Sequence, residues 1–479
     1  MANSIANSFF WTSLTQGANI FFKFLSLILL SRLLSPQEYG LLAIIMIFIE
    51  VGYMIADSGM GSSLVKKKNC EHVDYDTLFI YNLTVGCLIY LILWAAAPFI
   101  ASLYEMDVLV KLIRVASLQI IIHTLYAPQY IQIWKNLRFK TIAFATIIAT
   151  SGGLIVALIL AYNGYGVWAL IAQFLAEAFI YLLYYGLENR YFPRMQFSKY
   201  SFKEQFTFGI NLLGANLMNT VSNNLYNNVV AKIVNLKVAG FFVQASRIQN
   251  LPVSVINSVI DRALFPILSN TLSQKDFENV YFRVYGIFMM IVCFVSLILS
   301  VYANELVICV LGYKWCDAGA ILRILAISII PLSIQSVCRN ALKSKGKTFA
   351  ILKNQTIKTI ILISTLILAF VLGFWAIVFG VVIAQVIVTI LILFQTSSLI
   401  DLSFRKHFTI CVPFIIYLLI SLGVSSITTS SFSNEYLYLV LGARILSSTV
   451  VYVFLLGVFK NIYFMNVISH IGKWNILMR

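Results

Sequence analysis

Charged side chains are scarce in this chain of 479 residues. Asp, Glu, Lys and Arg make up 11% of it, whereas 60% of the residues are hydrophobic and the mean hydropathy is +0.90. Soluble domains carry roughly 25% charged residues, so this composition excludes a soluble globular protein. Apolar runs of about 20 residues, enough to cross a bilayer, recur from Phe9 to the C-terminus. The composition predicts an all-α membrane protein.

Several functional signatures are lacking as well. The seven cysteines form no CxxC pair and no metal-ligand spacing, so we expect small core residues and no metal site. The chain has no nucleotide-binding loop and no nucleophile–base arrangement, which predicts that it is not an enzyme and needs no cofactor. Its N-terminus lacks a basic region followed by a small-residue cleavage site, so we expect no cleaved signal peptide.

The apolar runs predict about fourteen transmembrane helices. The expected spans are 9–34, 39–60, 77–101, 108–127, 140–162, 165–187, 205–231, 236–264, 280–302, 317–339, 349–372, 374–398, 408–428 and 436–459. Every second connecting segment is rich in Lys and Arg, as at 66–68, 190–203 and 339–347. By the positive-inside rule, both termini and these segments are cytoplasmic in a bacterial inner membrane. Because the basic residues are dispersed in this way, they indicate topology and argue against nucleic-acid binding.

The sequence repeats at an offset of about 200 positions. Arg32-Leu33-Leu34 with Gly40 corresponds to Lys232-Ile233-Val234 with Gly240, and segment 166–170 matches 373–377. This pattern predicts two parallel six-helix repeats related by an axis along the membrane normal, with a cavity between the two lobes. The expected organisation is an N-lobe at 1–187, a cytoplasmic linker at 188–204, a C-lobe at 205–398, and two further helices with a cytoplasmic tail at 399–479.

The first span carries a polar stripe. Thr12, Gln16, Asn19, Lys23 and Ser26 follow one another at intervals of three or four residues, so they share one helix face. A lysine near mid-membrane costs several kcal/mol if it faces lipid. Two interpretations of Lys23 therefore remain open: it faces a polar cavity and contacts the substrate, or it forms a structural ion pair with the acid at position 50.

The seventh span, the repeat partner of the first, is rich in amides. Uncharged amides are donors and acceptors that suit hydroxyl-rich ligands, so this helix favours a polar passage. The alternative is a set of interhelical hydrogen bonds, worth about 0.6 kcal/mol each. Together with Arg247, a cation deep inside the eighth span, the predicted substrate-binding residues are Gln16, Asn19, Lys23, Asn216, Asn219, Asn223, Asn227 and Arg247.

Acidic residues inside spans are candidates for coupling transport to a proton or Na⁺. Glu50 and Asp57 lie seven residues apart, on one face of the second span, and form the predicted ion-coupling pair. Other polar positions within spans are Gln173, Glu177, His123, Gln244 and Asp261. A lone histidine such as His123 is more typical of a packed polar residue than of a ligand.

Short motifs resemble a known family. The segment Leu30–Pro36 with Tyr39-Gly40 looks like the first loop of the polysaccharide transporters, which include O-antigen and colanic-acid repeat-unit flippases. These transporters belong to the multidrug/oligosaccharidyl-lipid/polysaccharide exporter superfamily. Residues 56–61 with Leu64-Val65, residues 265–266 with Ser269, and residues 311–315 are similar to further landmarks. The resemblance covers roughly residues 5 to 400. It departs where the family often has an aspartate, because this chain has Tyr226 there, in Asn224-Leu225-Tyr226-Asn227.

The resemblance implies a flippase for surface polysaccharide biosynthesis, such as O-antigen, capsule or exopolysaccharide. Its substrate would be an oligosaccharide on a polyprenyl diphosphate, moved from the cytoplasmic to the periplasmic leaflet by alternating access. The implied partners are lipid-linked oligosaccharide, membrane lipids, a polysaccharide polymerase and a chain-length regulator.

Other functions remain as alternatives. A multidrug exporter of the same superfamily would favour an acidic, aromatic cavity. A lipid II flippase is a second alternative, chemically close to a repeat-unit flippase. A membrane polymerase or glycosyltransferase would need a long periplasmic loop or catalytic acids outside the membrane, and the predicted external segments are short.

Overall fold

The computed structural model is built from helices. It describes residues 2–189, 191, 193–269, 273–428, 437–459 and 461–465, apart from some side chains within helices. No strand occurs in these residues. The elements are α1 (Ala2–Leu33), α2 (Pro36–Asp57), α3 (Met60–Lys66), α4 (His72–Tyr104), α5 (Val108–Ala116), α6 (Leu118–Lys135), α7 (Phe139–Tyr162), α8 (Val167–Asn189), α9 (Lys199–Ile233), α10 (Leu236–Ser269), α11 (Gln274–Val301), α12 (Ala303–Leu311), the 3₁₀ helix η1 (Tyr313–Trp315), α13 (Cys316–Ile327), α14 (Ile329–Ser344), α15 (Thr348–Leu372), α16 (Phe374–Ile400), α17 (Phe404–Thr428) and α18 (Leu437–Val458).

Twelve helical segments of the described chain are long and apolar enough to cross a membrane. They coincide with all the predicted spans except the seventh and eighth. Those two correspond to α9 and α10, which have 35 and 34 residues. At 1.5 Å per residue each is about 50 Å long, which exceeds the thickness of a bilayer core. The structure confirms an all-α membrane protein, and the total of fourteen spans stays a prediction.

The chain forms two compact units, 1–243 and 244–479. This division falls inside α10, whereas the sequence repeat places the boundary in the linker before α9. In the structure α9 packs against α2, α3 and α4, so it belongs to the first unit by contact. The six-plus-six duplication describes the sequence, and it stays a prediction about the architecture.

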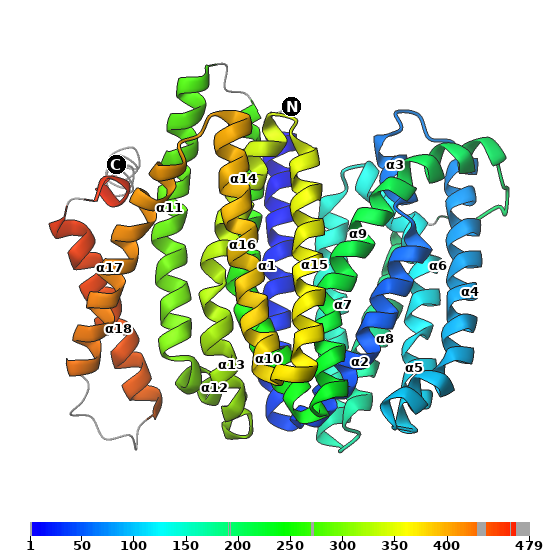
Figure 1. Ribbon diagram of the computed structural model, residues 1–479. Coiled ribbons are helices and arrows are strands. Elements are labelled where there is room, and N and C mark those ends of the chain that lie inside the picture. Colours follow the sequence, from blue (N-terminus) through cyan, green and yellow to red (C-terminus); the bar gives the residue numbers. More distant parts are fainter. Residues whose placement is uncertain are drawn as a thin grey trace. The chain divides into compact units, whose positions relative to one another are not determined.

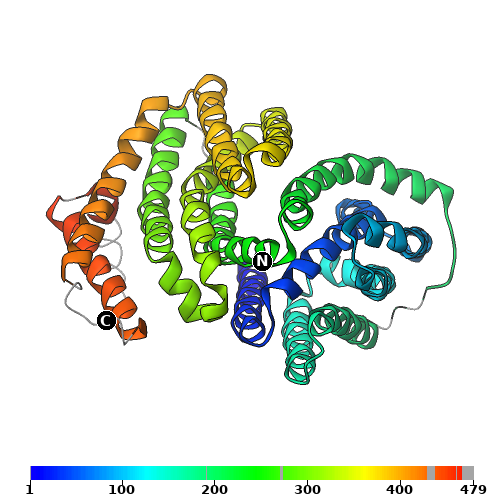
Figure 2. The ribbon, with the colours of Figure 1, turned by 60° about the horizontal axis from the view of Figure 1, so that its bottom comes forward.

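The first unit is a bundle in which neighbouring helices pack in the order α1, α7, α8, α6, α4, α2 and α9. Figure 1 shows α2 and α9 running side by side. The segment between α8 and α9 runs along the edge of the unit (Figure 2). Large apolar side chains such as Leu88, Leu91 and Phe99 on α4 point outward. Their exposure is expected of a helix whose outer face contacts lipid.

Two repeat-related glycines pack against each other's helices. A Cβ atom at Gly40 would overlap the carbonyl oxygen of Leu236, and a Cβ atom at Gly240 would overlap the carbonyl oxygen of Pro36. Both pairs lie in the first unit and differ by the same 200 positions that relate the sequence repeats. The first turns of α2 and α10 therefore cross with backbone against backbone, which only residues without a side chain allow.

The start of α2 is fixed by its own sequence. The backbone N–H of Ser35 donates to Glu38 Oε2 at 2.5 Å and its hydroxyl donates to the same oxygen at 2.9 Å, while Pro36 occupies the first helical turn. Ser, Pro and Glu in this order form a strong helix start. The motif that resembles the family's first loop thus has a structural role in the helix crossing.

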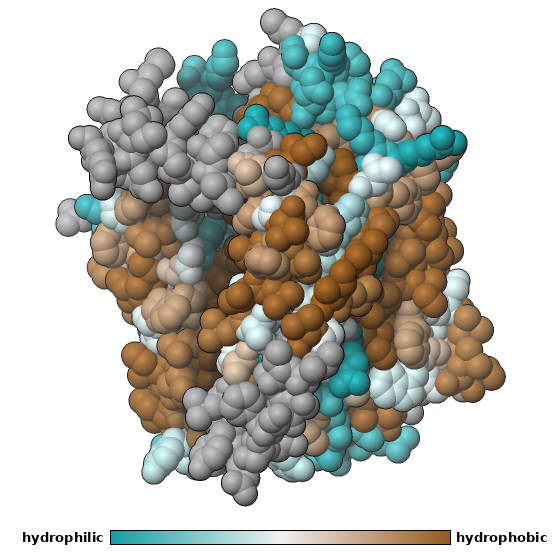
Figure 3. Space-filling model, turned by 90° about the vertical axis from the view of Figure 1, so that its left-hand side faces the viewer, coloured by the Kyte–Doolittle hydropathy of each residue, from teal (hydrophilic) through white to brown (hydrophobic). Residues whose placement is uncertain are grey.

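The second unit contains an extensive apolar core around α11. This helix packs on α13, α14 and α17, while α16 packs on α14 and α15. Its buried residues include Phe277, Tyr281, Tyr285 and Met289. On the face beside α17 and α18, hydrophobic side chains cover the middle and hydrophilic ones gather at both ends (Figure 3). This distribution suits a protein that spans a bilayer.

Candidate functional site

The polar stripe of α1 lies partly on the surface of the first unit. Gln16 and Lys23 are exposed, and Asn19 is half-buried. Little of the apolar part of this helix is buried inside the protein. In a bilayer, an exposed lysine at this depth must reach water or a ligand, because lipid gives it no partner.

One end of the stripe connects to an acid on α8. The Ser26 hydroxyl donates to Gln173 Oε1 at 3.3 Å, and Gln173 Nε2 donates to Glu177 Oε1 at 3.1 Å. Lys23, one turn before Ser26 on α1, lies within electrostatic reach of the Glu177 carboxylate. Helix α7 approaches closely here because Gly153 has no side chain: a Cβ atom would lie 2.9 Å from the Gln173 carbonyl oxygen.

Aromatic rings from α2, α6 and α8 form a cluster in the same unit. The rings of Tyr53 and His123 meet edge to face with centroids 4.7 Å apart, and those of His123 and Tyr126 are 5.0 Å apart. The ring centroids of Tyr126 and Tyr181 are 5.8 Å apart. Tyr53, Tyr126 and Tyr181 all lie within electrostatic reach of Glu177. The lone histidine is therefore packed among aromatic rings.

The predicted ion-coupling acids lie on α2. Glu50 is half-buried in the middle of this helix. Asp57 is its last residue, and its carboxylate accepts a hydrogen bond from the backbone of Gly59. The turn that follows has Ser58 at φ 46° and Gly59 at φ 70°, and the Ser58 hydroxyl lies 2.6 Å from that of Tyr81. Asp57 therefore stabilises the turn between α2 and α3, and a coupling role for it stays a prediction.

The remaining predicted residues cannot be joined into one site. The side chains of Asn216, Asn219, Asn223 and Asn227, although on α9, lie outside the described residues. Arg247 is half-buried on α10, in the second unit. The structure thus joins Ser26, one turn after Lys23, to Glu177 through Gln173. The amide lining stays a prediction.

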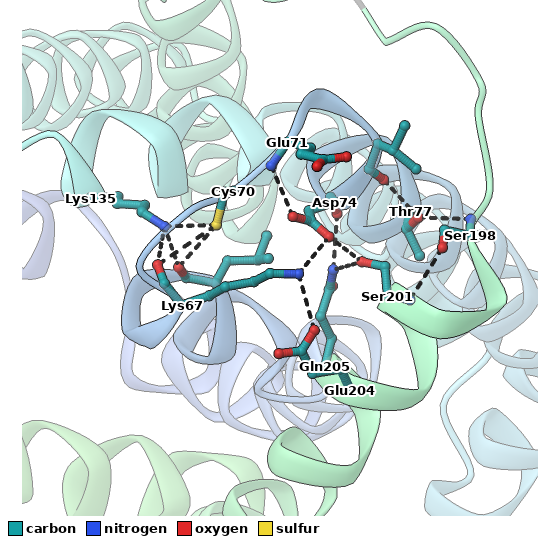
Figure 4. A network of polar contacts seen from close by, with 12 residues as sticks. Lys67, Cys70, Glu71, Asp74, Thr77, Lys135, Ser198, Ser201, Glu204 and Gln205 are labelled. Atoms are coloured by element: carbon teal, nitrogen blue, oxygen red, sulfur yellow. Dashed lines mark hydrogen bonds and ion pairs between the residues drawn. The ribbon is translucent and has the colours of Figure 1, made fainter.

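A second polar network, which we call the α9 anchor, ties the start of α9 to α3 and α4 (Figure 4). Lys67 Nζ lies 3.1 Å from Asp74 Oδ1 and 3.0 Å from Glu204 Oε2. The Ser201 hydroxyl donates to Asp74 Oδ1 at 2.6 Å, and Gln205 Nε2 donates to the Asp74 carbonyl oxygen at 3.1 Å. Burial lowers the pKa of Lys67, but its hydrogen bonds to Glu204 and Asp74 outweigh burial and raise the pKa overall, so this ammonium stays charged at neutral pH.

Asp76 extends the anchor into the segment before α9. It is fully buried and accepts hydrogen bonds from the Tyr191 hydroxyl, from the backbone N–H of Arg194 at 3.2 Å and from His72 Nδ1, which lies at 3.0 Å. Burial and the Asp76 carboxylate together raise the pKa of Tyr191, so its phenol keeps the proton that it donates. The sequence analysis missed this network, because its residues resemble ordinary charges at a helix end.

Lys135, the last residue of α6, contacts the end of α3 beside Lys67 of the anchor (Figure 4). Its ammonium donates to the carbonyl oxygens of Leu64, at 2.9 Å, and Lys67, and to Cys70 Sγ at 2.7 Å. A lysine at the last carbonyls of a helix is favourable because it offsets the helix dipole. Lys135 therefore caps the C-terminal end of α3.

The polar contacts of the second unit are largely uncharged. Gln335 Nε2 donates to Gln385 Oε1 at 3.2 Å and to Thr389 Oγ1 at 3.0 Å, which joins α14 to α16. Asn354 and Gln395 exchange hydrogen bonds of 2.7 and 2.9 Å between α15 and α16. Such amide pairs hold membrane helices together.

The described residues contain no group of three or more His, Cys, Asp or Glu that could hold a metal ion. All seven cysteines are free, and Cys293, Cys338 and Cys411 are buried.

Comparisons with known proteins agree with this architecture. Residues 29–320, more than half of the chain, match the model of a family described as polysaccharide biosynthesis protein. The succinoglycan biosynthesis transport protein ExoT of Rhizobium meliloti is 26% identical over 275 residues, which cover 57% of this chain and 56% of ExoT. The chain thus spans little more than half the length of that relative. The lipopolysaccharide biosynthesis protein WzxC of Escherichia coli is 24% identical to this chain. The match covers 83% of this chain and 82% of WzxC.

The fold resembles that of a solved membrane protein. A solved structure of the lipid II flippase MurJ, in an inward closed conformation, matches this chain with a TM-score of 0.77 and 15% sequence identity. The match covers 96% of this chain and 100% of the MurJ chain. At that identity the match concerns the fold alone. The family match rests on the sequence itself, and it agrees with the resemblance in the short motifs. The chain therefore belongs to the family described as polysaccharide biosynthesis protein.

Proposed function

We propose that this protein is a flippase for lipid-linked oligosaccharide. Its substrate is an oligosaccharide repeat unit on a polyprenyl diphosphate, and it moves from the cytoplasmic to the periplasmic leaflet of a bacterial inner membrane. Both termini lie in the cytoplasm, as the basic segments predict. The protein itself makes or breaks no covalent bond, and a polysaccharide polymerase and a chain-length regulator act on its product.

The exposed polar face of α1 carries this proposal. A repeat unit exposes many hydroxyl groups, and each costs several kcal/mol in hydrocarbon unless it finds a partner. Gln16 and Asn19 supply such partners, and Lys23 on the same face supplies a cation for the diphosphate. The prenyl tail can stay in lipid throughout, so only the polar head group needs this path.

A multidrug exporter would need a different site. Cationic drugs favour acids and aromatic rings on the accessible surface, whereas the exposed stripe of α1 offers amides and a lysine. The aromatic rings described above and Glu177 lie inward in the first unit, among α2, α6 and α8. A lipid II flippase would use the same diphosphate chemistry, and the sugar attached to the carrier distinguishes it from the main proposal.

Charge substitution tests the proposal. In proteoliposomes that contain a lipid-linked oligosaccharide, Lys23→Gln should slow translocation by roughly tenfold, because a charge-assisted contact with the diphosphate is lost. Arg247→Gln should have a similar effect. The matched control is Arg32→Gln, which removes an exposed cation from the end of the same helix as Lys23. Equal activity of all three variants at equal protein content would refute the assignment.

A further inference from the structure

The end of α4 away from the α9 anchor holds an arginine that the proposed function does not use. Arg114 of α5 stacks on the ring of Trp94, with its guanidinium 3.9 Å from the ring centroid, and its Nε donates to the Trp94 carbonyl oxygen at 3.3 Å. That carbonyl loses its usual partner within α4, because Pro98, four residues on, has no N–H group. Arg114 therefore satisfies α4 with one nitrogen. Its two terminal nitrogens contact no acceptor among the described residues.

No acidic side chain balances this charge. The ion pairs of the described residues do not include Arg114 or the exposed Lys111, which lies three residues earlier on the same face of α5. The opposite face of α5 is buried through residues such as Leu112 and Ile113. Both cations thus face away from the core, near the end of the membrane span Val108–Lys135.

Exposed apolar side chains lie deeper in the membrane than these cations. Leu91, one turn before Trp94, and Leu118, one turn after Arg114, are 58% and 38% exposed. Helix α4 runs towards its connection with α5, and α5 packs on it as the chain turns back (Figure 1), so both leucines lie nearer the membrane centre than the stacked pair. An exposed indole is typical of the level where headgroups meet hydrocarbon. Charge outside and apolar contacts inside are the order of groups in a phospholipid.

We propose that Arg114 and Lys111, with Trp94 as a platform, bind the headgroup phosphate of an anionic phospholipid. The fork of an arginine fits two phosphate oxygens, and stacking on an indole fixes its plane without using its terminal nitrogens. In the topology proposed above, this site lies in the periplasmic leaflet. Free phosphate and the diphosphate of the substrate carry similar groups. The neighbours here are leucines and a tryptophan rather than the amides that suit a sugar, which favours a phospholipid.

Brominated lipids test the inference, because bromine on an acyl chain quenches the fluorescence of a tryptophan that it touches. The full-length protein is reconstituted in phosphatidylcholine with a minor share of phosphatidylglycerol. Bromine is carried by the phosphatidylglycerol or, in matched vesicles, by an equal amount of phosphatidylcholine. The Trp94 signal is the difference from Trp94→Phe. We expect a roughly fivefold preference of this signal for brominated phosphatidylglycerol, the contribution of one cation near a membrane surface.

Arg114→Gln keeps a donor for the Trp94 carbonyl but removes the charge and the fork, so it should remove most of the preference. The matched control is Arg323→Gln, at an exposed arginine of α13 on which no ring of the described residues stacks. This control should keep the preference of the wild type. An unchanged preference in Arg114→Gln, or an equal loss in both variants, would overturn the inference.

Measurements on the wild type decide the outcome if Arg114→Gln fails to fold. Equal quenching by the two brominated lipids would contradict the inference without any variant. An excess of inorganic phosphate, or geranylgeranyl diphosphate at a content well below that of phosphatidylglycerol, should leave the preference in place. Its loss would assign the site to a free anion or to the substrate, and the inference would be wrong. None of these results measures translocation, so the proposed function is tested separately.

Discussion

The polar interiors of the two units differ in charge. In the first unit, hydrogen-bonded networks end on acids: Glu177 beneath the α1 stripe, and Asp74 and Asp76 in the α9 anchor. Among the described residues of the second unit, buried polar side chains are amides, hydroxyl groups and His407. Both kinds of network join neighbouring helices, but the networks of the first unit contain acidic groups.

This difference indicates a division of labour. A buried acid costs several kcal/mol unless it is paired, so neutral amides are the less costly way to hold helices together. The acids of the first unit therefore depend on their hydrogen-bond and ion-pair partners for stability. Asp76 accepts three hydrogen bonds and fixes the segment before α9, whereas Glu177 accepts a hydrogen bond from Gln173 of its own helix.

The largest effect is expected where the two repeats are alike, at the crossing of α2 and α10. Gly240→Leu and Gly40→Leu should each destabilise the protein by roughly 3 kcal/mol, because a side chain would meet a carbonyl group of the other helix. The loss should be similar for both, since the contacts are symmetric. Thermal unfolding in detergent measures it.

Gly17→Leu is the control for this pair, because a Cβ atom at Gly17 would meet nothing within 4 Å. It should leave the unfolding temperature nearly unchanged. A large difference in stability between the Gly40 and Gly240 variants would show that the two close contacts of the crossing do not contribute equally to folding.

A smaller effect is expected in the α9 anchor. Asp76→Asn should lower the free energy of unfolding by roughly 2 kcal/mol, because hydrogen bonds to a charged acceptor are replaced by bonds to a neutral one. It should also increase hydrogen exchange at the start of α9. Asp107→Asn, at an exposed position, should do neither. Unchanged exchange around Ser198 and Ser201 would show that Asp76 does not fix this segment.

The smallest effect is expected in the second unit. Gln335→Leu removes bonds to Gln385 and Thr389 and should cost about 1 kcal/mol, because each uncharged contact between membrane helices contributes little. Transport should stay close to that of the wild type. A loss of stability as large as that of Asp76→Asn would remove the distinction between the two units.

Much of the fold followed from the sequence because each span carries its own signal. The apolar runs predicted about fourteen spans, and twelve of these coincide with described helices long and apolar enough to cross a membrane. The offset between Gly40 and Gly240 marked two residues that occupy equivalent places in one crossing. The seventh span was harder, since α9 begins at Lys199 and its first turns are polar. Those turns are helical because the anchor on α4 binds them, and no local pattern reveals such a tertiary contact.

The candidate site was only partly predictable. Periodicity placed Lys23 and Ser26 on one helix face, which required only the sequence of that helix. The partner of Ser26 lies 147 residues away on α8. A single sequence does not show which helices become neighbours, so Gln173 and Glu177 could be named as polar residues inside a span but not joined to the stripe.

The most direct test of the central claim is a transport measurement on the wild-type protein. Proteoliposomes are loaded with a fluorescent oligosaccharide on a polyprenyl diphosphate, and its arrival in the opposite leaflet is followed with an impermeant quencher. Our account predicts protein-dependent movement of this lipid, and no export of a cationic dye from matched vesicles. Robust dye export without movement of the lipid-linked oligosaccharide would contradict it.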